Sequence, residues 1–139
     1  MKFRVFESPE IETPFALLSS QDVYTKLRPY AKADREMMLI LHLDNKNKII
    51  EIETHTIGAV DSSAVYPREV FRSALAYNSS SIIMAHNHPS GDCTPSREDI
   101  QITKVLRQGG ELIGIRVLDH IIFGLNGYRS LVDGGHLEN

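Results

Sequence analysis

A strand that ends in two histidines constrains the fold of this chain more than any other feature of its sequence. The apolar run Ser81–Ala85 predicts the strand, and His86 and His88 follow at its end, two residues apart. Because side chains alternate between the two faces of a strand, both imidazoles are expected on the same side of the sheet. Pro89 and Gly91 then predict a turn, so both rings should lie at an exposed strand end.

Asp99 comes eleven residues after His88, in the first turn of a predicted helix that Ser96 caps. On that helix Asp99 shares a face with Ile102 and Leu106, two apolar residues that should face the core. The carboxylate of Asp99 is therefore expected to point back toward the sheet, where the histidines end.

Two imidazoles and one carboxylate leave the fourth position of a tetrahedral zinc ion open, which is typical of a catalytic rather than a structural site. Zinc lowers the pKa of a water molecule in that position far below its usual value, toward about 7. We therefore predict that His86, His88 and Asp99 bind Zn²⁺ and that the chain is a hydrolase. Such a site also needs a general base and a group that polarises the substrate carbonyl.

The rest of the sequence predicts strands mixed with helices. Strands are expected at residues 2–6, 36–43, 48–56, 111–118 and 120–123, and helices at residues 20–29, from Pro67, from Ser96 to about Gln108, and after Tyr128. Residues 8–13 and 58–66 are expected to be irregular, and Gly109-Gly110 is expected to end the helix that Ser96 caps. This pattern predicts an α/β fold with a mixed central β-sheet flanked by helices. A length of 139 residues favours one domain over residues 1–139.

Charge and composition exclude several classes of protein. The formal net charge of -3 argues against a large phosphate-binding face, and hence against direct binding of DNA. The single cysteine, Cys93, allows no disulfide within the chain. No apolar run approaches the ~20 residues that span a bilayer, and no signal-peptide core follows Met1, so we expect a cytoplasmic protein without membrane contact.

The metal-site residues resemble a known family. His86-x-His88, followed by Ser96 and Asp99, matches the JAMM motif of the JAB/MPN metalloproteases, and the string His-Asn-His-Pro-Ser-Gly-Asp resembles the RadC branch. The segments Pro67-Arg68-Glu69 and Asp119-His120 also resemble RadC proteins, and the similarity extends over residues 20–133. The resemblance implies a zinc isopeptidase-like site, with His86, His88 and Asp99 as ligands, on a cytidine deaminase-like α/β fold.

The resemblance also implies roles for other residues. Ser96 would donate a hydrogen bond to the developing oxyanion, and Glu36 would take a proton from the zinc-bound water, which then attacks the amide carbonyl of a peptide or isopeptide. Glu69 is the rival of Glu36 as general base and is otherwise expected to face the substrate or support the ligands. His120 follows Asp119 and is a second candidate for such a supporting residue, although a core histidine paired with Asp119 is the favoured expectation.

Other functions compete with hydrolysis. Some MPN domains are interaction modules without catalysis, and the RadC name suggests a factor in DNA repair or mobile elements. Longer RadC proteins carry a helix-hairpin-helix segment, whereas this chain begins almost directly at the metal-site module, which weakens a role in DNA binding. The zinc deaminases need a Pro-Cys-x-x-Cys ligand pair, which one cysteine cannot supply. The sequence carries no signal for a particular oligomeric state.

Overall fold

The computed structural model describes residues 16–58 and 65–138, so the predicted strand at 2–6, the loop at 8–13 and most of the irregular segment 58–66 lie outside it. The elements are α1 (Ser20–Leu27), the 3-10 helix η1 (Arg28–Lys32), β1 (Met37–Leu43), β2 (Ile49–Ile57), α2 (Pro67–Ala76), β3 (Ser81–Asn87), α3 (Arg97–Ile113), β4 (Arg116–Gly124) and β5 (Gly127–Ser130). No helix in this part of the chain has the length and apolar character needed to cross a bilayer.

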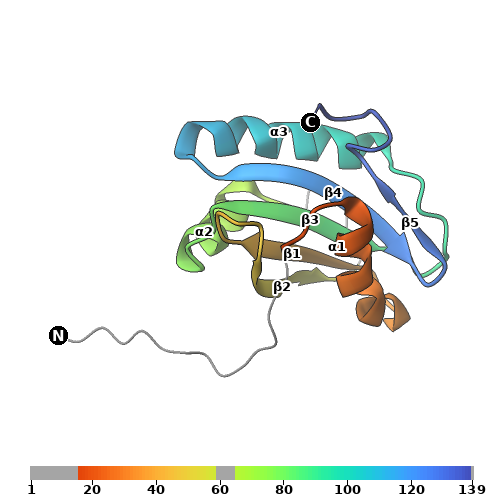
Figure 1. Ribbon diagram of the computed structural model, residues 1–139. Helices are drawn as coiled ribbons and strands as arrows, with labels where there is room; N and C mark the ends of the chain where they lie inside the picture. The colour runs from red at the N-terminus through yellow and green to blue at the C-terminus, as the bar shows by residue number, and fades with distance from the viewer. Residues whose placement is uncertain (1–15, 59–64, 139) are drawn as a thin grey trace, which may run out of the picture.

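The five strands form one mixed sheet in the order β2-β1-β3-β4-β5. β1 pairs antiparallel with β2 and with β3, β3 pairs parallel with β4, and β5 returns antiparallel to β4. Helix α3 forms the crossover between the parallel strands β3 and β4 (Figure 1). The predicted α/β class with a mixed sheet is confirmed.

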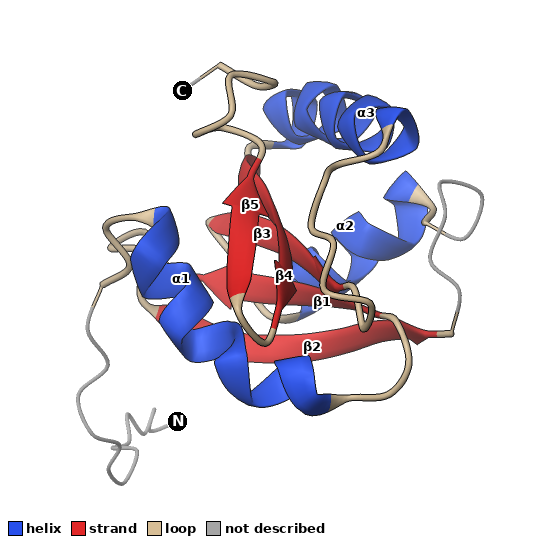
Figure 2. Ribbon diagram, turned by 90° about the vertical axis from the view of Figure 1, so that its right-hand side faces the viewer, coloured by secondary structure: helices blue, strands red, loops and turns tan. Residues whose placement is uncertain are grey.

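Helices cover both faces of the sheet. α1 and η1 lie on one face, and α2 and α3 lie on the other (Figure 2). Side-chain alternation in the central strands divides the core accordingly. Odd-numbered residues of β1 such as Leu39 and Leu41 pack with Leu27 of α1, while Met38 and Ile40 pack with Leu106 of α3. Both faces of the central strands are therefore buried.

The predicted end of α3 is wrong. The helix continues through Gly109 and Gly110 to Ile113 and ends at Gly114, which has a left-handed φ of 80°. Gly110 serves close packing instead of termination, because a Cβ atom there would lie 2.1 Å from the carbonyl oxygen of Ile115. The Ser96 cap and the burial of Leu106 on the core face are as predicted.

The C-terminal third of the chain differs from the prediction in two further ways. The two strands expected at residues 111–118 and 120–123 are the end of α3 and one continuous strand, β4. The short helix expected after Tyr128 is replaced by β5, which pairs Tyr128 with Phe123 across a tight connection. For β4 and β5, pairing with a neighbouring strand decides the local structure, and the local sequence does not carry that information.

Candidate metal centre

The three predicted zinc ligands converge at one end of the sheet. His86 is the penultimate residue of β3, His88 follows the strand, and Asp99 lies in the first turn of α3. The Nε2 atoms of His86 and His88 are 2.9 Å apart, and the Nε2 atom of His86 is 3.7 Å from Oδ1 of Asp99. His86 is buried, with 2% of its surface exposed. The structure thus brings these residues together as the sequence predicts.

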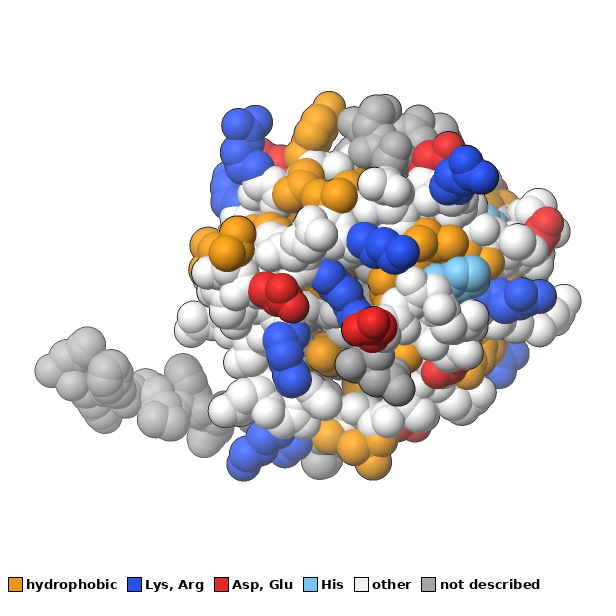
Figure 3. Space-filling model, turned by 90° about the horizontal axis from the view of Figure 1, so that it is seen from above, with side chains coloured by type: hydrophobic (Ala, Val, Ile, Leu, Met, Phe, Trp, Pro, Cys, Tyr) orange, Lys and Arg blue, Asp and Glu red, His pale blue; other side chains and the backbone are white. Residues whose placement is uncertain are grey.

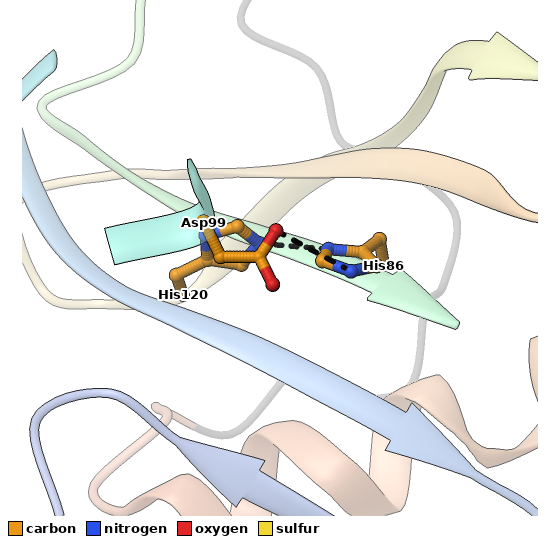
Figure 4. Close-up of side chains that lie close together, drawn as sticks. All are labelled: His86, Asp99 and His120. Atoms are coloured by element: carbon orange, nitrogen blue, oxygen red, sulfur yellow. Dashed lines mark hydrogen bonds and ion pairs between the residues drawn. The ribbon is translucent and has the colours of Figure 1, made fainter. Parts of the chain in front are cut away.

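His120 of β4 is a fourth residue of this cluster. Among the described residues, His86, Asp99 and His120 each offer an atom that could bind a metal, all within 4.8 Å of one another. Figure 4 shows the His86 ring facing both the Asp99 carboxylate and the His120 ring. The ligand set could therefore be completed by His88 or by His120, and the hydrogen bonds between these side chains distinguish the two.

A chain of hydrogen bonds determines which nitrogen of His86 carries the proton. The Thr103 hydroxyl donates its hydrogen to the Asp99 carbonyl oxygen at 2.6 Å, so its oxygen must accept from Nδ1–H of His120 at 2.8 Å. His120 then has a lone pair on Nε2, which accepts from Nδ1–H of His86 at 2.9 Å. The Nε2 atom of His86 consequently carries a lone pair that faces Asp99 and His88, while Nε2 of His120 is already used.

His88 presents a lone pair to the same point. Its Nδ1 atom lies 2.5 Å from the carbonyl oxygen of Asp92, and because a carbonyl only accepts, Nδ1 carries the proton. The Nε2 atoms of His86 and His88 therefore face each other as two acceptors, with the Asp99 carboxylate beside them. Acceptors that converge without a shared proton favour a bound cation.

The two separations from Nε2 of His86 can be compared with those between the ligands of a zinc ion. Ligands bound to zinc at about 2.1 Å in a tetrahedron lie roughly 3.4 Å apart, and the observed separations of 2.9 and 3.7 Å bracket that value. The three side chains whose donor atoms all lie within 4.8 Å of one another are His86, Asp99 and His120. His86, His88 and Asp99 stay the predicted ligand set, and in that assignment His120 lies behind His86 and orients it. The other interpretation of His120, a core histidine paired with Asp119, is wrong in its partner, since the hydrogen bond from His120 to Asp119 comes from the backbone N–H and the ring bonds to His86 and Thr103.

Burial keeps both inner rings in the form that binds metals. Burial, together with the nearby His120 ring, lowers the pKa of His86 to about 3. Burial likewise lowers the pKa of His120 to about 4. Both imidazoles are therefore neutral at pH 7, and a neutral ring nitrogen is the ligand that a metal requires.

The capping box of α3 orients the Asp99 carboxylate. Oδ2 of Asp99 accepts the backbone N–H of Ser96 at 2.8 Å, and the Ser96 hydroxyl accepts the backbone N–H of Asp99 at 3.0 Å. With Oδ2 held by the helix terminus, Oδ1 is the oxygen that faces His86. The side chain of Ser96 is exposed at the protein surface, next to this ligand.

The two glutamates proposed as general base lie in different places. Glu36 directly precedes β1, whose pairing with β3 ends with Met38 opposite His86. The alternation of β1, extended by one residue, predicts Glu36 on the sheet face that carries His86 and His88. Glu69 lies in the first turn of α2, where it forms an ion pair of 3.2 Å with Arg72. The roles of both residues in catalysis stay predictions.

Two side chains next to this centre are not predicted from the sequence. Thr103 completes the hydrogen-bond chain to His120, and its position one turn after Asp99 on the same helix was the available signal. Asn87, between the two histidines, bonds to the backbone on both sides of Glu36. No local sequence pattern predicts these hydrogen bonds, because the partners of Asn87 lie 50 and 52 residues away in the chain.

Comparison with known proteins identifies a family. A family model described as the RadC-like JAB domain matches residues 17–136. A UPF0758 protein of Methanosarcina mazei is 49% identical over 130 residues, which cover 92% of this chain and 57% of that protein. A UPF0758 protein of Staphylococcus carnosus is 42% identical over 132 residues, which cover 94% of this chain and 58% of that protein. The chain spans a little over half the length of these curated relatives, and their names state no activity.

Proposed function

The chain belongs to the RadC-like JAB domain family, and from that premise we propose that it is a zinc-dependent hydrolase of amide bonds in peptides or isopeptides. The observation that carries the proposal is that the Nε2 lone pair of His86 faces both the Nε2 lone pair of His88, at 2.9 Å, and the carboxylate oxygen Oδ1 of Asp99, at 3.7 Å. A zinc ion held by His86, His88 and Asp99 supplies a Lewis acid that activates water and polarises a carbonyl group at neutral pH.

The chain's own residues supply the proton transfers and the charge stabilisation. Glu36 accepts a proton from the water that attacks the carbonyl carbon and passes it to the nitrogen of the departing amine, so that the C–N bond breaks as the N–H bond forms. The oxygen of the Ser96 hydroxyl accepts the Asp99 amide, and its O–H group is then the donor for the oxyanion that develops on the substrate. The exposure of Ser96 suits contact with a macromolecular substrate.

A pair of glutamate variants tests the proposal. The zinc-loaded wild type is first screened against a peptide library, and the cleaved peptide is then given to Glu36→Gln and Glu69→Gln. We expect Glu36→Gln to lower kcat by about 10²- to 10⁴-fold, as for loss of a general base, while zinc remains bound. Glu69→Gln, whose carboxylate pairs with Arg72, should retain activity.

Each alternative result has a separate meaning. Loss of cleavage in Glu69→Gln with full activity in Glu36→Gln would exchange the roles of the two glutamates. A wild type that binds zinc and cleaves no peptide in the library would refute the assignment as a peptide hydrolase. A protein that takes up no zinc would favour an interaction module without catalysis.

We further propose that the domain does not act through direct contact with DNA. Its 18 acidic residues outnumber its 15 Lys and Arg residues. On the face seen in Figure 3, basic side chains are interspersed with acidic and apolar ones and form no continuous stripe. A shift of DNA mobility at near-physiological salt that weakens as salt rises would contradict this view.

A further inference from the structure

Asn87 lies between the two histidines of the metal centre in the sequence, but its side chain is on the other face of the sheet. It is the last residue of β3 and is 1% exposed. Alternation along the strand sends His86 and His88 toward α3 and Asn87 toward the layer that contains α1. Neither the metal centre nor the catalytic roles proposed above account for a buried carboxamide at this position.

The carboxamide of Asn87 brackets the backbone of Glu36. Its Oδ1 accepts the backbone N–H of Met37 at 2.7 Å, and its Nδ2 donates to the carbonyl oxygen of Arg35 at 2.9 Å. These partners flank Glu36 on either side, and they leave no ambiguity about which end of the amide is oxygen, because one partner is a donor and the other an acceptor.

The two hydrogen bonds of the Asn87 side chain take the place of backbone pairing between β1 and β3 beyond the end of their ladder. The pairing of β1 with β3 runs from Leu43 opposite Ser81 to Met38 opposite His86 and goes no further. On the other side of β1, the backbone N–H of Gly58 donates to the Glu36 carbonyl oxygen at 2.8 Å. The backbone around Glu36 is therefore held from both neighbouring strands, and on the β3 side the Asn87 side chain provides the hold.

We propose that Asn87 is a positioning residue for Glu36: its two hydrogen bonds hold the backbone of residues 35–37 so that the Glu36 side chain is directed to the sheet face that carries His86 and His88. This inference rests on the proposed function, in which Glu36 is the general base. It explains why the residue between the two ligands should be asparagine. An aspartate could accept from Met37 but would face the Arg35 carbonyl without a hydrogen to donate, and a serine is too short for both contacts.

The kinetic test compares Asn87→Ala with a matched control. Displacement of a catalytic group by about 1 Å costs up to about 10²-fold, so Asn87→Ala should lower kcat by about 10- to 100-fold while KM and zinc content stay at wild-type values. Ser79→Ala also loses a buried side-chain hydrogen bond, that to His42, but lies far from the centre and should keep the wild-type kcat. An Asn87→Ala variant with unchanged kcat, or with a change in KM alone, would overturn the inference.

A second background separates positioning of Glu36 from general loosening of the fold. In Glu36→Asp the carboxylate is already displaced by one methylene group, so adding Asn87→Ala should lower kcat by no more than about threefold. Two residues that act through one group give such a non-additive result. An equal fold loss in the wild type and in Glu36→Asp would show that Asn87 acts independently of Glu36.

A third measurement needs no substrate. With Co²⁺ as the metal probe, the paramagnetic relaxation of the labelled Glu36 side-chain carbon reports its distance from the ion. We expect that relaxation to fall in Asn87→Ala while the His88 ring signals stay as in the wild type. Equal Glu36 relaxation in both proteins would refute the inference, whereas a change in relaxation in a protein without hydrolase activity would refute the proposed function alone.

Discussion

The hydrogen bond between His86 and His120 makes a sharp prediction for His120→Phe. His120 is fully buried, and its Nε2 atom is the acceptor for Nδ1–H of His86 at 2.9 Å. Phenylalanine fills a similar volume but offers no acceptor. Thr103 keeps its own bond to the Asp99 carbonyl oxygen in the variant, so the one donor that loses its partner is Nδ1–H of His86.

The expected magnitudes follow from that count. A buried N–H group without a partner costs about 1–3 kcal/mol of stability. Loss of the residue that orients a metal-binding histidine weakens metal affinity by about 10- to 100-fold, which corresponds to roughly 1.4–2.7 kcal/mol. Because the His86 side chain is almost fully buried, no water can easily replace the lost acceptor, and we expect the upper half of both ranges.

The assay is competition for zinc against a chromophoric chelator, with urea unfolding of the metal-free proteins in parallel. His42→Phe is the matched control, since His42 is also fully buried and makes two ring hydrogen bonds, to Ser79 and Glu53, away from the metal centre. His42→Phe should lose stability but keep zinc affinity within about twofold, as expected for independent sites. Wild-type zinc affinity in His120→Phe, or an equal loss in His42→Phe, would refute the reasoning.

Two further predictions concern the fold. Gly110→Ala places a Cβ atom 2.1 Å from the Ile115 carbonyl oxygen, so we expect urea unfolding to show a loss of about 3 kcal/mol of stability. Gly127→Ala is the control and should be nearly neutral, because a Cβ there would meet nothing within 4 Å. Equal stability of the two variants would contradict the packing argument. Burial raises the pKa of Glu53, but hydrogen bonds from Ser73 and two histidines outweigh it and lower that pKa below 4.5. The wild type should therefore exceed Glu53→Gln by about 1–2 kcal/mol at pH 7, with a difference that shrinks as pH falls below 4.5; a difference that does not change with pH would refute the assignment.

Local periodicity and turn chemistry predict the elements that local sequence determines. The hairpin strands expected at 36–43 and 48–56 begin and end within one residue of β1 and β2, and Pro67 begins α2 as predicted. The glycine pair at 109 and 110 shows where such reasoning fails. Glycine ends helices when it supplies a left-handed φ, but here it permits close approach, since a Cβ on Gly109 would lie 3.1 Å from the Phe71 ring. Only the tertiary contact distinguishes these two uses.

In the metal centre, too, one part can be predicted from local sequence and another part cannot. Strand alternation and helix facing suffice to predict that His86, His88 and Asp99 meet, because each follows from one element's own geometry. The residues that orient these three side chains cannot be predicted from the geometry of one element. His120 reaches His86 only because β4 pairs with β3 in a register that puts His120 opposite Met84. Supporting contacts of this kind depend on strand order, which no single segment encodes.

Polar residues at the end of β3 give that strand its register. Its apolar residues Ile82 to Ala85 are buried on both faces, so a slip by one residue would leave them equally covered. The slip would, however, send His86 toward the aliphatic layer around α1 and Asn87 toward α3, because each one-residue shift exchanges the faces. Asn87 would then lose two hydrogen bonds and His86 the one to His120, all in a buried setting, at about 1–3 kcal/mol for each group left without a partner. The contacts that arrange the centre for chemistry therefore also select the pairing of β3 with β1 on which the fold depends.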